Sequence, residues 1–253
     1  MTYGLIGYPL SHSFSQPYFT EKFARLGLSN THQYLNFPLA SLTEFPSLLR
    51  RYPDLRGLNV TLPHKTNIVS YLDELDPLAA AVGAVNTIVV GQDGQTKGYN
   101  TDVLGFQTDV QEFIMSGIGE PKEHKAMVLG VSGGAALAVT YALQQMKIAY
   151  LGVSRLAGPQ AVIYEDIRAS VLADYTLIIN ATPLGMFPNV DAAPHLPYRA
   201  FGHQHFAYDL VYNPAVSLFL RLAGQRGAAT RNGLGMLHGQ AEAAWDIWTA
   251  EGN

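Results

Sequence analysis

A strand, a glycine turn, a helix and a second strand follow one another between Lys125 and Ser154, and this succession constrains the fold more than any other feature. The letters read KAMVLG, then VSGGA, then an alanine-rich stretch, then IAYLGVS. Such a succession is typical of a βαβ unit with parallel strands. Small residues at the turn let backbone N–H groups approach a pyrophosphate at the helix N-terminus, so we predict a dinucleotide site; an ordinary βα turn is the alternative. The predicted cofactor turn comprises Gly130, Ser132, Gly133, Gly134 and Ala135.

The end of the second strand indicates which dinucleotide would bind. Ser154 and Arg155 stand where an acidic residue would bind the ribose hydroxyls of NAD. An arginine suits a 2′-phosphate instead, so we predict NADP. A solvated surface arginine is the alternative interpretation of Arg155.

Strand and helix patterns alternate along the rest of the chain. Gly57–Leu62 is predicted to be a buried strand halted by Pro63, and Pro214–Ala223 a helix. We predict an α/β protein with two domains. An N-terminal α/β substrate-binding domain spans residues 1–101, and a Rossmann-type dinucleotide-binding domain spans residues 102–232. Residues 116–124 have the composition of a loop between the lobes, and residues 233–253 are expected to form a C-terminal helix that packs back on the first domain.

Composition excludes several classes of function. With 48% hydrophobic and 14% charged residues the chain is globular. Its net charge of −4 has no basic block behind it, so neither a nucleic acid nor a membrane is an expected partner. The absence of cysteine removes disulfides and thiolate ligands, and we expect no metal site. No apolar run approaches the roughly 18 to 20 residues of a membrane span, and no basic leader precedes the first strand, so we expect a cytoplasmic protein with a small-molecule substrate.

Polar side chains gather at the predicted strand ends of the first domain. Ser13 and Ser15 place hydroxyls at alternating positions, a density of donors that suits a carboxylate; turns, or a helix cap by Ser15, are the alternatives. Asn59, Thr61, Asn86, Asn100 and Thr101 add neutral groups that both donate and accept hydrogen bonds. Together they predict a pocket for a ring carrying hydroxyls and a carboxylate.

Lys65 and Asp102 are the predicted pair for proton transfer, because ketone reduction needs a proton at the developing alkoxide. An ordinary surface ion pair is the alternative. His12 and His64 stay open as candidates for the acid, since nothing in the sequence decides against them.

Motifs along almost the whole chain resemble those of the shikimate dehydrogenase family: HSFS, GLNVTLPHK, GAVNT, GYNTDVLGF, SGGA, NATPLGM, YDLVYNP and NGLGMLHGQA. The resemblance implies reduction of 3-dehydroshikimate by NADPH in chorismate and aromatic amino-acid biosynthesis, by a monomer or homodimer. It implies that Ser13 and Ser15 bind the substrate carboxylate, with Tyr212 adding a hydroxyl, and that Lys65 and Asp102 are catalytic. The ring hydroxyls would be bound by Asn59, Thr61, Asn86, Asp102 and Gln240. The cofactor would be lined by Asn180, Ala181, Thr182 and Met186, with Gly233 and Met236 beside the nicotinamide.

The chain departs from the family pattern at two places in the cofactor half. GVSGGA replaces the usual G-x-G-G-A, and Arg155 is the one basic residue left of the usual 2′-phosphate clamp. In the substrate half, Gln16 is inserted into the usual HSxSP. A quinate or dual quinate/shikimate dehydrogenase is the nearest alternative function. A non-catalytic sugar-acid binding protein would be expected to lose Lys65 or Asp102, and a methylenetetrahydrofolate dehydrogenase would not need the hydroxyl-binding set.

Overall fold

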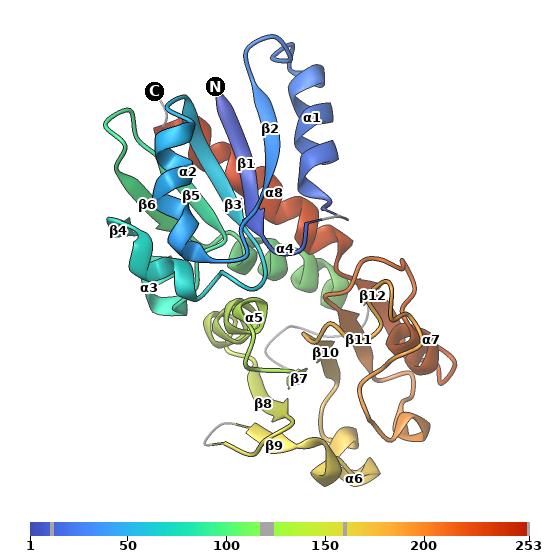
Figure 1. Cartoon of the computed structure of the whole chain (residues 1–253). Helices are drawn as coiled ribbons and strands as arrows, with labels where there is room; N and C mark the ends of the chain where they lie inside the picture. The colour runs from blue at the N-terminus through green and yellow to red at the C-terminus, as the bar shows by residue number, and fades with distance from the viewer. Residues whose placement is uncertain (11–12, 117–123, 159–160, 252–253) are drawn as a thin grey trace. The chain divides into compact units, whose positions relative to one another are not determined.

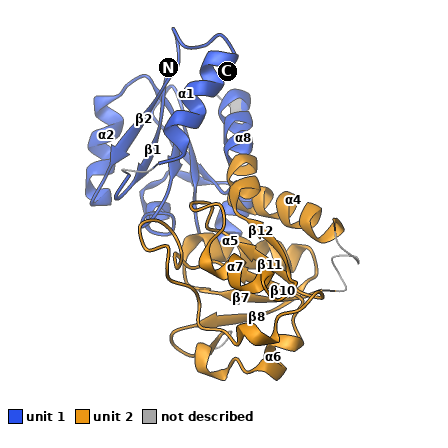
Figure 2. Ribbon diagram, turned by 90° about the vertical axis from the view of Figure 1, so that its right-hand side faces the viewer, with its two compact units in different colours: residues 1–101, 241–253 blue, residues 102–240 orange. Residues whose placement is uncertain are grey.

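The computed structural model describes residues 1–10, 13–116, 124–158 and 161–251 (Figure 1). The chain divides into two compact units (Figure 2). Unit 1 comprises Met1–Thr101 and Ala241–Asn253, and unit 2 comprises Asp102–Gln240. Most of the predicted loop at residues 116–124 lies outside the described residues.

Unit 1 is built on a mixed six-stranded sheet in the order β2-β1-β3-β5-β6-β4. The first three strands in this order are parallel, while β5 runs antiparallel to both β3 and β6. The strands are β1 (Thr2–Gly7), β2 (Gln33–Pro38), β3 (Leu55–Val60), β4 (Glu74–Leu75), β5 (Thr87–Val90) and β6 (Thr96–Tyr99). The helices are α1 (Ser15–Arg25), α2 (Phe45–Arg51) and α3 (Pro77–Val82), with 3₁₀ turns η1 (Leu42–Glu44) and η2 (Asn67–Tyr71).

Both faces of this sheet are covered, which explains why β1 is buried along its whole length. On one face a core cluster joins Ile6, Leu58 and Ile88 to Phe45 of α2. On the other face Tyr3, Leu5 and Tyr34 pack with α1 and with residues 241–248. Successive residues of a strand point to opposite faces of the sheet. Ile6 of β1 therefore points toward α2, whereas Tyr3 and Leu5 point toward α1.

Unit 2 is a parallel six-stranded sheet in the order β12-β11-β10-β7-β8-β9. Its strands are β7 (Lys125–Leu129), β8 (Ala149–Ser154), β9 (Ala161–Ile163), β10 (Leu177–Asn180), β11 (Phe206–Asp209) and β12 (Ala229–Asn232). Counted from β7, this is the order 3-2-1-4-5-6 of dinucleotide-binding sheets, with the direction of winding reversing between β7 and β10. The predicted Rossmann-type fold is confirmed. The helices of this unit include α4 (Asp102–Met115), α5 (Gly134–Gln145), α6 (Ala169–Ala173) and α7 (Leu218–Gly224).

The last helix, α8 (Leu234–Glu251), belongs to both units. Its end returns to the sheet of unit 1, where Trp248 donates to the Ile88 carbonyl at 3.0 Å. Trp248 also lies so close to Gly57 that a Cβ there would meet the indole nitrogen at 2.3 Å. The predicted return of the C-terminal helix is confirmed. The division between the units falls after Gln240, inside the helix, because the preceding turns pack closely on Gly105 of α4.

Two predicted elements have different bounds in the structure. The strand predicted at Gly57–Leu62 spans Leu55–Val60. The helix predicted from Pro214 begins at Leu218, because the Ser217 hydroxyl caps it by accepting from the Leu220 amide at 3.3 Å. Within the described residues, no helix combines the length and apolar character needed to cross a bilayer.

Candidate active site

Unit 1 holds a connected group of buried amides and hydroxyls around the end of β3 and the start of β5. Asn86 is at its centre: its Oδ1 accepts from the Thr101 amide at 2.8 Å, and its Nδ2 donates to Thr101 Oγ1 at 2.9 Å. Asn59 Nδ2 lies 3.4 Å from Thr87 Oγ1, which in turn donates to Asn86 Oδ1 at 3.1 Å. The structure therefore brings together Asn59, Asn86 and Thr101, which sequence reasoning selected, through Thr87, which it did not.

Tyr34 is a second residue that the sequence analysis missed. It is buried on β2, and its hydroxyl donates to Asn59 Oδ1 at 2.7 Å. Burial raises its pKa well above the ordinary tyrosine value, and a side-chain hydrogen bond from Ser15 acts in the opposite direction. Tyr34 thus connects Ser15 with Asn59, two predicted substrate ligands from different elements. A tyrosine in a strand carries no local signal of such a role.

The serine loop precedes α1. The helix begins at Ser15 itself, and the residue before it, Phe14, makes no side-chain cap, so the Ser15 hydroxyl is not the helix cap that the sequence left open. Ser13 Oγ is buried with no hydrogen-bond partner among the described residues. A buried hydroxyl in that condition favours a polar ligand. Thr61 is half-buried, and His12 lies outside the described residues.

Lys65 lies in the turn after Pro63, half-buried, and its carbonyl accepts from the Val85 amide at 2.8 Å. The neighbouring His64 is buried, and its Nε2 lies 2.7 Å from the Leu39 carbonyl. A carbonyl can only accept, so Nε2 must carry a proton there. This contact ties the imidazole to the segment after β2.

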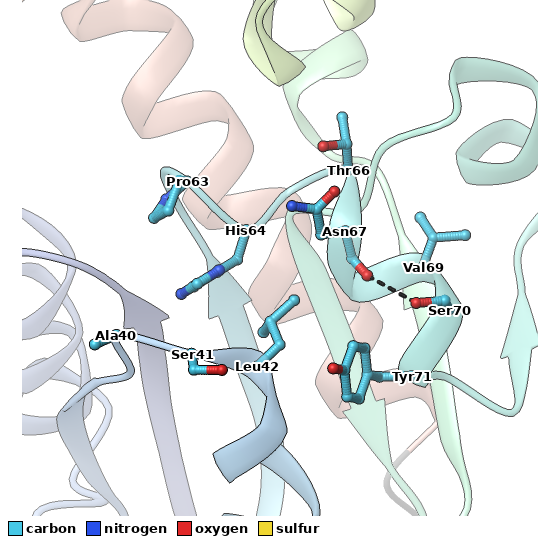
Figure 3. A pocket seen from close by; sticks show the side chains of 10 residues that line it. All are labelled: Ala40, Ser41, Leu42, Pro63, His64, Thr66, Asn67, Val69, Ser70 and Tyr71. Atoms are coloured by element: carbon cyan, nitrogen blue, oxygen red, sulfur yellow. Dashed lines mark hydrogen bonds between the residues drawn. The ribbon is translucent and has the colours of Figure 1, made fainter.

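A hollow of about 660 Å³ lies beside this turn (Figure 3). It lies between the segment after β2 and η2, and Ser70 Oγ donates to the Asn67 carbonyl at 3.1 Å along its wall. None of the predicted substrate residues lines it, so we do not assign the substrate to this hollow. Its lining consists of Ala40, Ser41, Leu42, Pro63, His64, Thr66, Asn67, Val69, Ser70 and Tyr71.

The remaining predicted substrate residues belong to unit 2. Asp102 is the first residue of α4 and is buried, and Gln240 is buried with its Nε2 donating to the Leu237 carbonyl at 3.0 Å. Tyr212 follows β11, and burial raises the pKa of its phenol. Because Lys65 is in unit 1 and Asp102 in unit 2, the pairing of the two side chains stays a prediction.

The glycine turn lies at the point where the winding of the unit 2 sheet reverses, between β7 and α5. Gly130 has a φ of +86° and faces Thr182 so closely that a Cβ would meet its Cγ2 at 2.5 Å. Gly133 precedes the first residue of α5, and open space surrounds the position of a Cβ there. With Ser132 exposed and Gly134 starting a 12-residue helix, the turn offers backbone N–H groups and a helix N-terminus to an anion. These features fit a pyrophosphate.

The predicted 2′-phosphate contact lies at the end of β8. Ser154 Oγ accepts from the Leu156 amide at 3.1 Å and donates to the Leu156 carbonyl at 2.5 Å, which shapes the turn. Arg155 is exposed between them. Burial raises the pKa of the Tyr164 phenol, and the charge of Arg155 acts against that rise. A guanidinium in this position fits a phosphate on the adenosine ribose.

The other predicted cofactor residues lie at the end of β10, in the loop that follows it, and around the start of α8. Asn180 is fully buried, Ala181 N donates to the Leu129 carbonyl at 2.9 Å, and Met186 is 42% exposed. Gly233 is required by close packing, because a Cβ would meet the Leu210 carbonyl oxygen at 2.3 Å. Met236 is buried in the first turn of α8. Across the described parts of the chain, no group of three His, Cys, Asp or Glu side chains is placed to hold a metal ion.

Comparisons with known proteins cover nearly the whole chain. A sequence profile of the shikimate dehydrogenase substrate binding domain matches residues 5–88. The NADP(+) shikimate dehydrogenase of Desulforamulus reducens is 35% identical, over 97% of this chain and 89% of that protein.

Solved structures of similar proteins also cover nearly the whole chain. Shikimate 5-dehydrogenase from Thermus thermophilus, in complex with NADP(H) and shikimate, is 32% identical with a TM-score of 0.83, over 99% of this chain and 94% of that one. A quinate dehydrogenase from Corynebacterium glutamicum, in complex with NAD, has a TM-score of 0.84 at 26% identity, over 99% and 94% of the two chains.

Proposed function

The chain belongs to the shikimate dehydrogenase family, and we propose that it catalyses the reversible NADPH-dependent reduction of 3-dehydroshikimate to shikimate. It is an oxidoreductase that acts on a CH–OH group. The observation that carries the proposal is the connected group of neutral amides and hydroxyls in unit 1, in a chain whose second unit has a dinucleotide-binding sheet. A ring acid with several hydroxyls needs such a mixture of donors and acceptors.

The two halves of the chain have separate roles in this proposal. Residues 1–101 supply most of the substrate ligands, with Ser13 and Ser15 at the substrate carboxylate, to which Tyr212 of the second half adds a hydroxyl. Residues 102–232 bind NADPH, with the pyrophosphate at the glycine turn and the 2′-phosphate at Arg155, and the helix in residues 233–253 returns to the first domain. The ring hydroxyls are bound by Asn59, Thr61, Asn86, Asp102 and Gln240.

In the proposed mechanism, bound NADPH supplies the hydride, and this chain's residues handle the charge and the proton. The Lys65 ammonium donates to the ketone oxygen and stabilises the negative charge that develops on it. Asp102 accepts from the adjacent ring hydroxyl. Lys65 then supplies or relays the proton to the alkoxide.

A chorismate mutase/shikimate 5-dehydrogenase fusion protein from Clostridium acetobutylicum is 32% identical over 98% of this chain, with a TM-score of 0.81. That fusion supports a role in chorismate and aromatic amino-acid biosynthesis. We also propose that the protein works in the cytoplasm, as a monomer or homodimer with small-molecule partners.

The test is spectrophotometry of nicotinamide reduction by the purified protein. Shikimate and quinate are each combined with NADP+ and with NAD+. We expect the highest kcat/KM with shikimate and NADP+. A higher value with quinate would reassign the substrate, a higher value with NAD+ would reassign the cofactor, and no turnover in any combination would favour a non-catalytic binding protein.

A further inference from the structure

Asp209 is a buried carboxylate to which neither the sequence motifs nor the proposed mechanism gives a role. It ends β11, next to Asn180 at the end of β10, and the two residues are directly paired across the strands. Both are fully buried. A buried carboxylate is retained only where hydrogen bonds replace its lost hydration, so the partners of Asp209 show what it organises.

The two oxygens of Asp209 bind different parts of unit 2. Oδ1 accepts from Asn180 Nδ2 at 2.9 Å and from the Val211 amide at 3.0 Å. Oδ2 accepts from the hydroxyl of Ser217, the residue that caps α7. One oxygen therefore faces the loops after β10 and β11, and the other faces a helix start.

The Oδ1 contact sets the orientation of the Asn180 amide. An ionised carboxylate only accepts, so the amide must turn its NH₂ toward Asp209 and its oxygen away. That oxygen accepts from the Thr182 amide at 3.1 Å and from Thr182 Oγ1 at 2.6 Å. Thr182 Oγ1 then accepts from the Leu184 amide at 3.2 Å. A relay of hydrogen bonds thus runs from Asp209 into the loop that begins at Asn180.

We propose that Asp209 is a positioning residue that orders two segments, residues 180–186 and residues 210–212, without touching either ligand. The inference rests on the proposed function, under which the first segment lines the cofactor and the second presents Tyr212 to the substrate. The carboxylate fixes the flip state of Asn180 and hence the turn at Thr182 and Leu184. Through the Val211 amide it also fixes the turn that leads to Tyr212.

The charge of Asp209 is part of this role, because hydrogen bonds to an ionised acceptor are stronger than those to a neutral one. Burial raises the pKa of Asp209 to about 6, against the hydrogen bonds from Ser217, Val211 and Asn180 that lower it. The ionisable groups that sense its charge are the phenols of Tyr198 and Tyr208, whose pKa values are themselves raised, first by burial and then by nearby carboxylates. Both phenols stay neutral at pH 8, where the carboxylate is ionised.

The test compares Asp209→Asn with Ser217→Ala in the full chain at pH 8. The first removes the charge and one acceptor oxygen; the second removes the donor to Oδ2 and leaves the Oδ1 contacts in place. We expect the Kd for NADPH, measured by its fluorescence, to rise at least about fivefold in Asp209→Asn and to stay within twofold in Ser217→Ala. Equal NADPH affinity in wild type and Asp209→Asn, or an equal loss in both variants, would overturn the proposal.

Hydrogen exchange without ligand separates this proposal from the proposed function. The amides of Thr182, Leu184 and Val211 donate within the relay, so we expect them to exchange faster in Asp209→Asn and unchanged in Ser217→Ala. Unchanged exchange in Asp209→Asn would overturn the role of Asp209. A wild-type protein that does not bind NADPH would count instead against the proposed function.

Thr182→Val keeps the test open if Asp209→Asn folds poorly, because it breaks the relay away from the buried carboxylate. We expect Thr182→Val to weaken NADPH binding. Both changes interrupt one chain of contacts, so the double variant should bind NADPH no more weakly than whichever single variant has the lower affinity. Fully additive losses would show that the two residues act independently, against the proposal.

Discussion

The phenol hydroxyl of Tyr34 donates a hydrogen bond of 2.7 Å to Oδ1 of Asn59, across the intervening strand β1. Because the phenol holds the amide oxygen, the amide nitrogen of Asn59 faces Thr87 and the Asn86 carbonyl, each at 3.4 Å. The orientation of a predicted substrate ligand is therefore set by a residue outside the predicted site.

Tyr34→Phe removes this single oxygen. A hydrogen bond between neutral groups contributes about 0.5–1.5 kcal/mol, so we expect the KM for shikimate to rise roughly two- to tenfold. The KM for NADP+ should not change, since the contacts of Tyr34 are in unit 1. Tyr3→Phe is the matched control: Tyr3 packs in the same aromatic cluster, and its hydroxyl lies 3.8 Å from Met1 Sδ. An equal rise in both variants would contradict a specific role for Tyr34.

Lys65→Ala should lower kcat by at least about a hundredfold with little change in the KM for shikimate, because the lost interaction forms with charge that develops in the transition state. Steady-state kinetics at saturating NADP+ would measure it. Lys97→Ala, which removes a lysine lying over the Tyr99 ring in the same unit, serves as control and should retain its kcat. A Lys65 variant with near-normal turnover would remove this lysine from the chemistry.

Arg155→Ser should raise the KM for NADP+ about tenfold or more and leave the KM for NAD+ almost unchanged, because only NADP+ carries the 2′-phosphate. The comparison uses one variant with two cofactors. Arg168→Ser, at an exposed arginine just before α6, is the control. If both cofactors were affected alike, Arg155 would have a role in the fold and not in cofactor selection.

Asp209 should make stability depend on pH. Its folded-state pKa of about 6 lies above the ordinary value of 3.8, so its contribution to stability is fully present below about pH 3.8 and is lost as pH rises through 6. The pKa of Asp209 lies one pH unit above pH 5, and one such unit corresponds to a change in stability of about 1.4 kcal/mol. Urea unfolding measures the free energy of unfolding of each protein. The value for Asp209→Asn minus the value for the wild type should therefore increase by about this amount from pH 5 to 7.5. A constant difference would show that the carboxyl is not shifted upward.

Glu242 should stabilise unit 1 through Lys22. Its carboxylate receives hydrogen bonds from the buried Lys22 ammonium and from the Tyr18 phenol. Burial raises the pKa of Glu242, but these two hydrogen bonds together with the positive charges of Lys22 and Arg25 outweigh that effect, so the pKa is lowered. Glu242→Gln should cost about 1–2 kcal/mol, less than for a fully buried pair because the Glu242 side chain is 48% exposed.

The Lys22 pair can be tested by thermal unfolding of three variants. Glu242→Gln leaves a buried ammonium without its carboxylate, whereas Lys22→Met with Glu242→Gln removes both charges. We expect the double variant to recover much of the loss in Tm. A double variant as unstable as the single one would mean that packing, and not the charge pair, accounts for the effect.

Much of the fold could be predicted from local patterns. The strand, glycine turn and helix around Gly130 follow from hydrophobic periodicity and from the placement of small residues, and both are local properties. The helix predicted from Pro214 was wrong at its start, because Ser217 caps the helix three residues later. Within the candidate site, Asn59 and Asn86 could be chosen from their residue types, but Thr87 could not, since threonine is common in strands for reasons of packing alone.

The sequence by itself determined the alternation of strands and helices, the cofactor turn, and the chemical types of the predicted ligands. Only the tertiary structure decided which side chains contact one another. Leu5 of β1 pairs with Asn36 of β2 on one side and with Asn59 of β3 on the other, and this register brings Tyr34 to Asn59 although 25 residues separate them. Asp209 reaches Asn180 for the same reason, because β10 and β11 are neighbours in register. Such contacts depend on strand order and register, which are set by burial over the whole sheet and not by any short stretch of chain.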